Sequence, residues 1–333
     1  MAELETIEMR AAYCNALLEI AEKDKRLVVL DADLMKASGV MPFKKAHPDR
    51  GIDVGVAEAN LVGVASGLSL KGFVPFASTF ACFAARRAFD QFFISSNYAK
   101  LNVKLVGTDP GVSAEFNGGT HMPFEDLTMM KMIPGLTIVE PSDDISAGKF
   151  THLLFEHDGC CYMRLHRKKL ERVYKEDEKF ELGKAKILAE GKDAVVFALG
   201  GVMVRESLKA YEMLKKEGIN ATVVDVLTLK PIDRQLIIDQ ISKKHVVVTC
   251  ENGQVAGGLA SEIAEIIAYE GLSCKFRMVG VFDQFGQVGK LDYLLGAYQL
   301  TAEVIAQKVR TALRTTVKVG FGGPGFGMKI GNK

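Results

Sequence analysis

Short apolar runs alternate with stretches of helical periodicity along the first half of the chain. The runs are bounded by Gly, Pro and Asp, and they are apolar throughout rather than at every second position. Strands that are buried on both faces have this pattern, so we predict a parallel sheet covered by helices on both sides. The predicted strands are 26–31, 51–56, 73–76, 103–106 and 136–139, and the predicted helices are 7–23, 58–70 and 81–99.

The same alternation begins again after a charged stretch. Residues 166–193 carry little apolar periodicity, which is typical of a surface connection between domains. Beyond it, strands are predicted at 194–199, 221–226, 245–249 and 276–279, with a helix at 204–217. We therefore predict an α/β protein with two doubly wound, mainly parallel-sheet domains at 1–170 and 193–315, a linker at 171–192, and a flexible, glycine-rich tail at 316–333.

Composition excludes several classes of function. The 333 residues include 42 basic and 41 acidic side chains, so the charge gives no reason to expect binding to nucleic acid or to a membrane. No apolar run approaches the roughly 20 residues needed to span a bilayer, and the charged N-terminus is unlike a secretory signal. The six cysteines are scattered without a CxxC pair, which favours reduced thiols and a cytoplasmic protein. No metal-ligand spacing is present, and we expect no metal site on this chain.

Glu58 is the first candidate for chemistry. In a helix at 58–70, Leu61, Val62 and Ala65 share a face with Glu58, so its carboxylate lies on an apolar stripe. A carboxylate in such surroundings can share a proton with a ligand nitrogen. The alternative is a first-turn glutamate that is stabilised by the helix dipole and partly solvated. The pattern alone leaves both interpretations open.

His121 is the second candidate. It lies in the segment GGTHMP, after the predicted strand 103–106, and glycines allow a backbone to approach a ligand closely. A histidine on such a loop can act as an acid, a base or a hydrogen-bond donor. An ordinary surface histidine is the alternative.

Four segments follow one another in an order that resembles a known family. They are GVAEAN at 55–60, ASTF at 77–80, GGTH at 118–121, and a stretch at 133–143 that contains EPSD. The succession resembles the pyrimidine-binding domain of transketolase and of 1-deoxyxylulose-5-phosphate synthase. KPID at 230–233 and ENG at 251–253 are similar to the family's C-terminal domain. The resemblance covers about residues 5–315 and implies a thiamin-diphosphate-binding fold followed by a transketolase C-terminal-like domain.

One family motif has no counterpart in this sequence. Full-length transketolases carry a Gly-Asp-Gly motif, followed by Asn, that holds Mg²⁺ and the diphosphate of the cofactor. This chain contains no Gly-Asp-Gly. It therefore resembles the C-terminal subunit of a split transketolase, and we expect an N-terminal subunit that carries the diphosphate and Mg²⁺ site, in an α2β2 heterotetramer.

The resemblance implies catalytic roles for Glu58 and His121. Glu58 matches the glutamate that binds N1′ of the thiamine aminopyrimidine, and Phe80 and Phe83 match the aromatic wall around that ring. Asp33 matches an acid near the thiazolium. His121 matches the histidine that contacts the hydroxyl of the donor ketose. For the two phenylalanines, ordinary core packing is the alternative.

Arginines are the expected contacts for a substrate phosphate, since a guanidinium binds phosphate through two parallel hydrogen bonds. By the resemblance, Arg10 and Arg167 match the family's phosphate contacts, and Arg164 and Ser38 are weaker candidates. A surface ion pair is the alternative for each arginine.

Two departures from the family affect the expected substrate. Asn117 stands where transketolases have an aspartate that reads the acceptor's 2-hydroxyl. Asp109, or its neighbour Thr108, stands where they have a phosphate-binding histidine. An aspartate repels phosphate, so we expect an unusual ketose or ketose phosphate as donor.

The expected function is therefore thiamine-diphosphate-dependent transfer of a two-carbon ketol unit from a ketose to an aldose. Two related activities remain open: a 1-deoxyxylulose-5-phosphate synthase-like subunit, suggested by RAFDQ at 87–91, and the β subunit of a 2-oxo-acid dehydrogenase. A non-catalytic binding or assembly subunit is a further alternative. The joint presence of Glu58, Phe80 and His121 counts against it.

Overall fold

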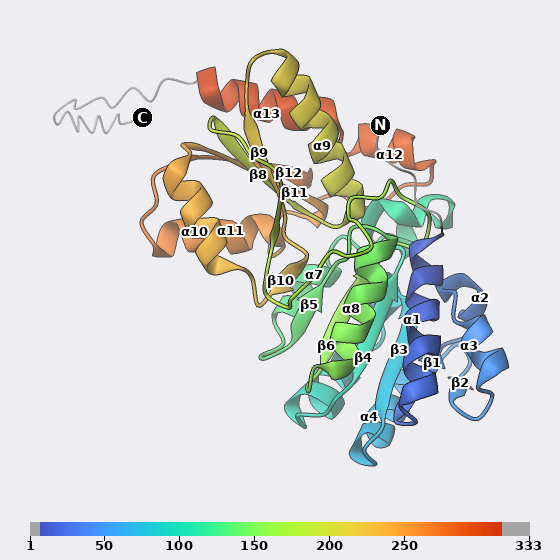
Figure 1. Cartoon of the computed structure of the whole chain (residues 1–333). Helices are drawn as coiled ribbons and strands as arrows, with labels where there is room; N and C mark the ends of the chain where they lie inside the picture. The colour runs from blue at the N-terminus through green and yellow to red at the C-terminus, as the bar shows by residue number, and fades with distance from the viewer. Residues whose placement is uncertain (1–6, 315–333) are drawn as a thin grey trace, which may run out of the picture.

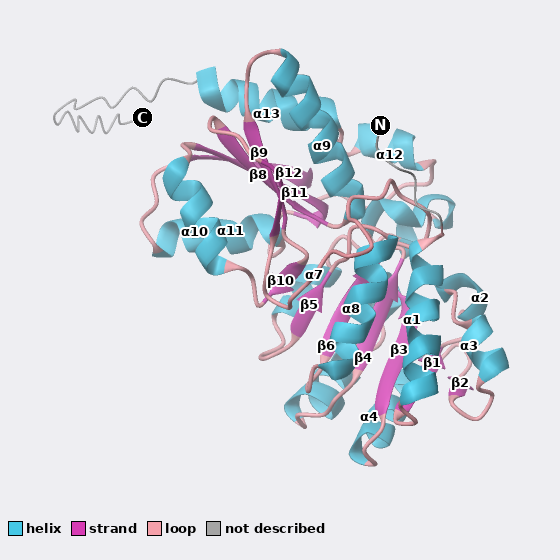
Figure 2. Cartoon of the chain, in the orientation of Figure 1, coloured by secondary structure: helices cyan, strands magenta, loops and turns pink. Residues whose placement is uncertain are grey.

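The structure is a computed structural model that describes residues 7–314. Two sheets, each with helices on both faces, form two domains (Figures 1 and 2). The predicted α/β fold class is confirmed, whereas the predicted tail at 316–333 lies outside the described residues. Within 7–314, no helix is long and apolar enough to cross a membrane.

The first sheet has seven strands in the order β10-β5-β6-β4-β3-β1-β2, and all neighbours are parallel except β10 and β5. Helices α1 (Met9–Lys23) and α8 (Asp144–Glu156) pack together on one face, and α4 (Glu58–Leu70) packs on the other. The strands contributed by the first domain are β1 (Leu27–Asp31), β2 (Gly51–Asp53), β3 (Val74–Phe80), β4 (Lys104–Thr108), β5 (Thr137–Val139) and β6 (Cys161–Leu165).

The second sheet has five strands in the order β12-β11-β8-β9-β7. Helices α9 (Gly201–Lys216) and α13 (Ala302–Arg314) pack against one core, and α10 (Arg234–Lys243) and α11 (Leu259–Tyr269) against the other. The strands are β7 (Lys186–Ala189), β8 (Ala194–Leu199), β9 (Ala221–Asp225), β11 (Val246–Gln254) and β12 (Lys275–Val281).

Three features differ from the sequence-based predictions. In place of one helix at 81–99, the chain forms α5 (Ala81–Arg86), α6 (Phe89–Gln91) and the π-helix η1 (Phe92–Tyr98). The predicted linker contains β7, which pairs antiparallel with β9. Strand β10 (Thr228–Lys230) leaves the second domain and completes the edge of the first sheet beside β5.

Shorter elements connect these layers. They are α2 (Met35–Ser38), α3 (Met41–Ala46), α7 (Asp126–Lys131), α12 (Leu291–Ala297), and the 3-10 helices η2 (Gly111–Asn117) and η3 (Gly119–His121).

A buried arginine ties the two domains together. Arg164, on β6, is fully buried, and its Nε donates to Oδ2 of Asp126 at 2.9 Å. Its Nη1 donates to Oε2 of Glu140 at 3.1 Å, and its Nη2 donates to the carbonyl of Asn252 in the second domain at 2.8 Å. A buried charge is tolerated only when it is paired and hydrogen-bonded, so these contacts fix the junction.

Glu140 gives this junction a pH dependence of defined sign. Burial raises the pKa of its carboxyl from 4.5 to about 7, although Arg164 opposes the shift. The unfolded chain releases the proton near the ordinary value. The stabilisation that protonated Glu140 contributes is therefore complete below the unfolded pKa of 4.5, and it is lost as the pH rises through the folded pKa of about 7.

We predict that Glu140→Gln flattens the pH profile of stability. Between about pH 5 and pH 8 the wild-type chain should lose roughly 1 to 3 kcal/mol that the variant does not lose. Urea denaturation at a series of pH values measures this. Glu212→Gln, at an exposed position of α9, is the matched control and should follow the wild type. Parallel profiles for the wild type and Glu140→Gln would contradict the assignment.

Candidate functional site

The carboxyl ends of four neighbouring parallel strands bring most of the predicted site residues to one edge of the first sheet. Asp33 follows β1, Phe80 ends β3, Asp109 follows β4 and Arg167 follows β6. Parallel α/β sheets bind ligands at this edge, outside the ends of the strands. Figure 1 shows these strands side by side.

Glu58 combines the two interpretations that the sequence left open. It is the first residue of α4, as a first-turn glutamate would be, but it is 4% exposed. Leu61, Val62 and Ala65 are fully buried. Glu58 is buried as well because it lies on the same face of α4. Its Oε1 accepts a hydrogen bond from Nη1 of Arg87 at 2.8 Å.

Aromatic side chains continue the site from Glu58 to His121. The guanidinium of Arg87 lies 3.8 Å from the ring centroid of Phe83, and the rings of Phe80 and Phe83 are 5.9 Å apart. The ring of His121 meets both edge-on, at 6.0 Å from Phe80 and 5.2 Å from Phe83. A buried carboxylate, an aromatic wall and an imidazole are therefore contiguous, with Arg87 joining the carboxylate to the wall.

Arg87 was not predicted to be part of the site. It follows α5, where the helix breaks, and this break turns its side chain toward Glu58. Two signals in the sequence could have pointed to it: Arg87 opens the RAFDQ segment at 87–91, and it lies four residues after Phe83 in what periodicity assigned to a continuous helix.

The loop that carries His121 is held by a second unpredicted arginine. Nη1 of Arg86 donates to the carbonyl of Thr120 at 2.8 Å, and its Nη2 donates to the carbonyl of Met122 at 3.1 Å. Nδ1 of His121 lies 2.9 Å from Oγ1 of Thr120. Gly118 has φ +81°, which favours glycine at this turn.

The other end of the site is a cluster of basic groups around Asp109. Nε of Arg167 binds Oδ1 of Asp109 at 3.0 Å, and its guanidinium lies 5.8 Å from the ring centroid of Phe80. Burial raises the pKa of Asp109 to about 6, while the charges of Arg167, Lys168 and Arg10 oppose the rise. Asp109 therefore does not stand alone against an anion, because an arginine already pairs with it.

Among described residues, Oδ2 of Asp109 has no hydrogen-bond partner although the side chain is 2% exposed. Arg10 lies at the rim of this cluster. Its Nη1 donates to the carbonyl of Ala37 at 2.9 Å and its Nε donates to Glu8 at 2.7 Å. The Arg10 side chain is therefore held in place on the backbone of α2.

Two of the weaker substrate candidates lie inside the protein. Arg164 belongs to the buried junction network, which replaces the substrate contact expected from the sequence. Ser38 is fully buried, and its Oγ donates to Oδ2 of Asp31 at 2.6 Å, so it supports the β1 end from behind. Both are corrected from substrate contacts to structural residues.

Two other candidates lie at exposed positions. Asp33 has φ +62°, and its backbone N–H donates to Oδ1 of Asp53 at 2.9 Å. The side chain of Asp33 is exposed to solvent. Asn117 is exposed at the end of η2, four residues before His121.

Two family models cover most of the chain. The model of the transketolase pyrimidine-binding domain matches residues 5–172, and the model of the transketolase C-terminal domain matches residues 183–305. The chain belongs to the transketolase family. The 6-deoxy-6-sulfo-D-fructose transketolase subunit SqwH of Clostridium sp. (strain MSTE9) is 47% identical over 319 residues, covering 96% of this chain and 98% of the relative.

Other transketolase relatives differ in how much of their length matches. The putative transketolase C-terminal section of Methanocaldococcus jannaschii is 39% identical, covering 92% of this chain and 96% of the relative. Human transketolase is 35% identical, covering 91% of this chain but 49% of the relative. A solved structure described as a split gene transketolase, inactive beta4 tetramer, matches with a TM-score of 0.85 at 42% identity, covering 92% of this chain and 98% of that one. The predicted resemblance to a split-transketolase subunit is confirmed.

The residues present fit one end of the cofactor that transketolases use. The carboxylate of Glu58 is buried beside the aromatic wall, which suits a flat aminopyrimidine with a ring nitrogen at its edge. In residues 7–314, no group of three or more His, Cys, Asp and Glu side chains is arranged to hold a metal ion. The described part of this transketolase chain thus offers contacts for the pyrimidine end.

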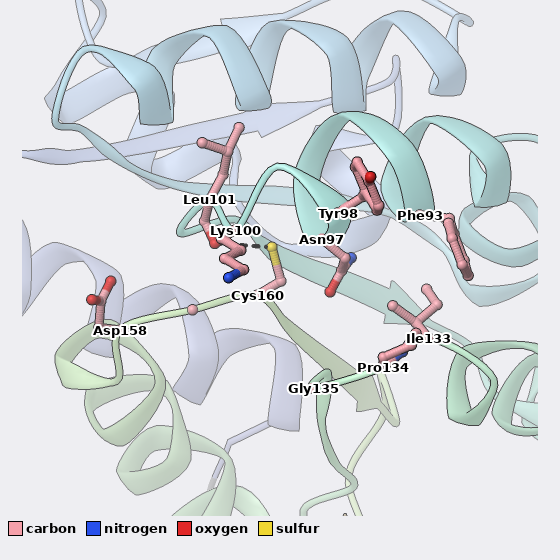
Figure 3. Close-up of a pocket in the computed structure, with 11 residues that line it drawn as sticks. Phe93, Asn97, Tyr98, Lys100, Leu101, Ile133, Pro134, Gly135, Asp158 and Cys160 are labelled. Atoms are coloured by element: carbon pink, nitrogen blue, oxygen red, sulfur yellow. Dashed lines mark hydrogen bonds between the residues drawn. The ribbon is translucent and has the colours of Figure 1, made fainter.

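A separate cavity lies at the opposite end of the first sheet. It has a volume of about 810 Å³ and is lined by apolar side chains that include Phe93, Tyr98, Leu101 and Ile133 (Figure 3). Cys160 borders it and donates through Sγ to the carbonyl of Leu101 at 3.1 Å. None of the predicted site residues lines this cavity.

The contact between Glu58 and Arg87 can be measured without any assay of activity. Removing Arg87 leaves a buried carboxylate without its cation, whereas removing both charges together leaves neither unpaired. We predict that Arg87→Met lowers the free energy of unfolding, that Glu58→Gln alone has a smaller effect, and that the double variant recovers about 1 kcal/mol. Urea denaturation of the wild type, the two single variants and the double variant provides this double-mutant cycle. Additive effects would show that the two side chains are uncoupled.

Proposed function

We propose that this chain is the subunit of a split transketolase that binds the aminopyrimidine end of thiamine diphosphate. With a partner subunit that carries the diphosphate and Mg²⁺ site, it transfers a two-carbon ketol unit from a ketose to an aldose. The observation that carries the proposal is the buried Glu58 carboxylate, which Arg87 joins to the cluster of Phe83 and His121. Family membership supports it.

Glu58 would bind the cofactor at N1′ of the aminopyrimidine. When bound, thiamine diphosphate supplies the covalent chemistry of ketol transfer, and the protein positions it. In this structure, Arg87 is hydrogen-bonded to the carboxylate of Glu58. Its side chain is 47% exposed, so it can move away from Glu58 when the ring enters. Phe80 and Phe83 would hold the ring by packing and would exclude water from the proton that it shares with Glu58.

His121 would hold the hydroxyl of the donor ketose. Its ring lies edge-on against Phe80 and Phe83, so its free nitrogen is directed by packing rather than by chance rotation. A histidine can donate or accept a hydrogen bond near neutral pH, which suits a group that must handle a sugar hydroxyl during transfer.

The donor ketose in this proposal ends in a sulfonate. Arg167 and Arg10 supply positive charge, and the Clostridium relative is named for 6-deoxy-6-sulfo-D-fructose. Asp109, buried next to Arg167, repels a phosphate with a charge of about −1.5 to −2 more strongly than a singly charged sulfonate. The aspartate thus favours the lower charge while keeping the arginine in place.

The assembly in this proposal is an α2β2 heterotetramer with an N-terminal transketolase subunit in the cytoplasm. The match to almost the full length of a split-gene transketolase chain supports a separate partner. The described cysteines are all free, which agrees with a reducing compartment.

Replacement of Glu58 tests the central role. In the enzyme assembled from both subunits, Glu58→Gln should lower kcat for ketol transfer by at least about 100-fold, because the amide cannot share the proton as a carboxylate does. Steady-state kinetics with added thiamine diphosphate and Mg²⁺ measure this, and Glu212→Gln is the control on an exposed position. Full activity of Glu58→Gln, or ketol transfer by this chain without its partner, would contradict the proposal.

A panel of donors tests the sugar. We expect kcat/KM to be highest for 6-deoxy-6-sulfo-D-fructose and lower for fructose 6-phosphate and xylulose 5-phosphate. Asp109→Asn should shift the ratio toward the phosphates by about tenfold, since one negative charge is removed from the anion site. A wild-type preference for xylulose 5-phosphate would refute the sulfonate assignment and leave the transketolase assignment intact.

A further inference from the structure

The second domain contacts the loop that carries His121 at the start, the middle and the end of that loop. This loop, residues 110–124, is here called the histidine loop. It leaves β4, forms η2 and η3, and ends before α7. Helix α12 lies next to η2, as Figure 1 shows. Three different parts of the second domain contact the start, the middle and the end of the histidine loop.

Asn252, at the end of β11, holds the start of the histidine loop. Its Nδ2 donates to the carbonyl of Pro110 at 2.9 Å, and its Oδ1 accepts from the backbone N–H of Val112 at 2.9 Å. The side chain is 1% exposed, and its own carbonyl accepts from Arg164. Because both ends of the amide are used, it can take one orientation only.

The backbone of Gly286 lies against the middle of the histidine loop. A Cβ atom on Gly119 would lie 2.2 Å from the carbonyl oxygen of Gly286, and a Cβ atom on Gly286 would lie 2.7 Å from Cα of Gly119 and 2.8 Å from Cβ of Met122. The two backbones therefore touch, which only glycine at both positions permits. This contact lies two residues before His121.

Tyr298 holds the end of the histidine loop and the segment that presses on it. Its ring packs against Phe124 with centroids 5.2 Å apart, and its hydroxyl donates to the carbonyl of Phe285 at 2.7 Å. The backbone N–H of Gln254 donates to the carbonyl of Phe124 at 2.7 Å. A cavity of about 590 Å³ beside these contacts leaves room for the loop to shift when the grip is weakened.

We infer that the second domain positions His121 for the substrate, and that Gly286, Asn252 and Tyr298 are the positioning residues. They do not touch the aromatic wall or Glu58, and they act by fixing the backbone on both sides of His121. The effect on turnover rests on the proposed ketol transfer, whereas the mechanical effect on the histidine loop does not. A displacement of about 1 Å at a group that contacts substrate can cost up to about 100-fold in rate.

Gly286→Ala, with Gly296→Ala as its control, tests this inference. A Cβ atom on Gly286 meets the histidine loop, while one on Gly296, in α12 of the same domain, meets nothing within 4 Å. In the full chain assembled with its partner, Gly286→Ala should lower kcat/KM for the donor by at least about tenfold, because the displaced backbone moves His121 away from the substrate. Affinity for thiamine diphosphate should not change, because Glu58 is untouched. Gly296→Ala should match the wild type in both.

Hydrogen exchange of backbone amides provides a readout that is independent of turnover. Peptides that cover 111–124 should exchange faster in Gly286→Ala, and to a smaller extent in Tyr298→Phe, which removes only the hydroxyl. Exchange as slow as in Gly296→Ala, or faster exchange with unchanged kcat/KM, would overturn the inference. A wild-type assembly without ketol transfer would overturn the proposed function, and the exchange data would still decide whether the second domain holds the loop.

Discussion

A single buried cation at the domain junction organises much of the molecule. Arg164 has no access to water, so each of its donors must find an acceptor within the protein. The acceptors come from α7, from the end of β5 and from β11, which are far apart in the sequence. The backbone carbonyl that Arg164 holds belongs to Asn252, so the same charge that docks the domains also fixes a residue that grips the histidine loop.

Much of the fold could be predicted because each buried strand leaves a local signature. Uniform apolar runs located β1, β4 and β5 to within a few residues. The π-helix, β7 and β10 were missed because they depend on contacts outside their own segments. Strand β10 is only three residues long and two of them pair with β5, and no periodicity in so short a run separates a strand from a loop.

The same reasoning explains which site residues could be predicted. Glu58 and His121 lie in short segments whose own chemistry is unusual, so they were found locally. Arg87 and Arg86 act through the partners they reach across the fold, and nothing in their neighbourhood identifies those partners. Arg164 was assigned to substrate as a weaker candidate for the family's phosphate contacts, but it is within β6 and Arg167 is beyond its end. Arg167 follows Arg164 by three residues, and this is enough to place Arg164 in the protein interior and Arg167 at the edge of the sheet where ligands bind.

The crossing of β10 also limits how this architecture can be divided. Without that strand, β5 would become the edge of the first sheet and would present unpaired backbone groups to other chains. Lys230 strengthens the join, since its Nζ donates to the carbonyls of Lys131 and Ile133 at 2.9 and 2.6 Å. Division of the chain at the connecting segment would therefore leave the edge of β5 uncovered and open to pairing with other chains, which makes the two domains a single unit of folding.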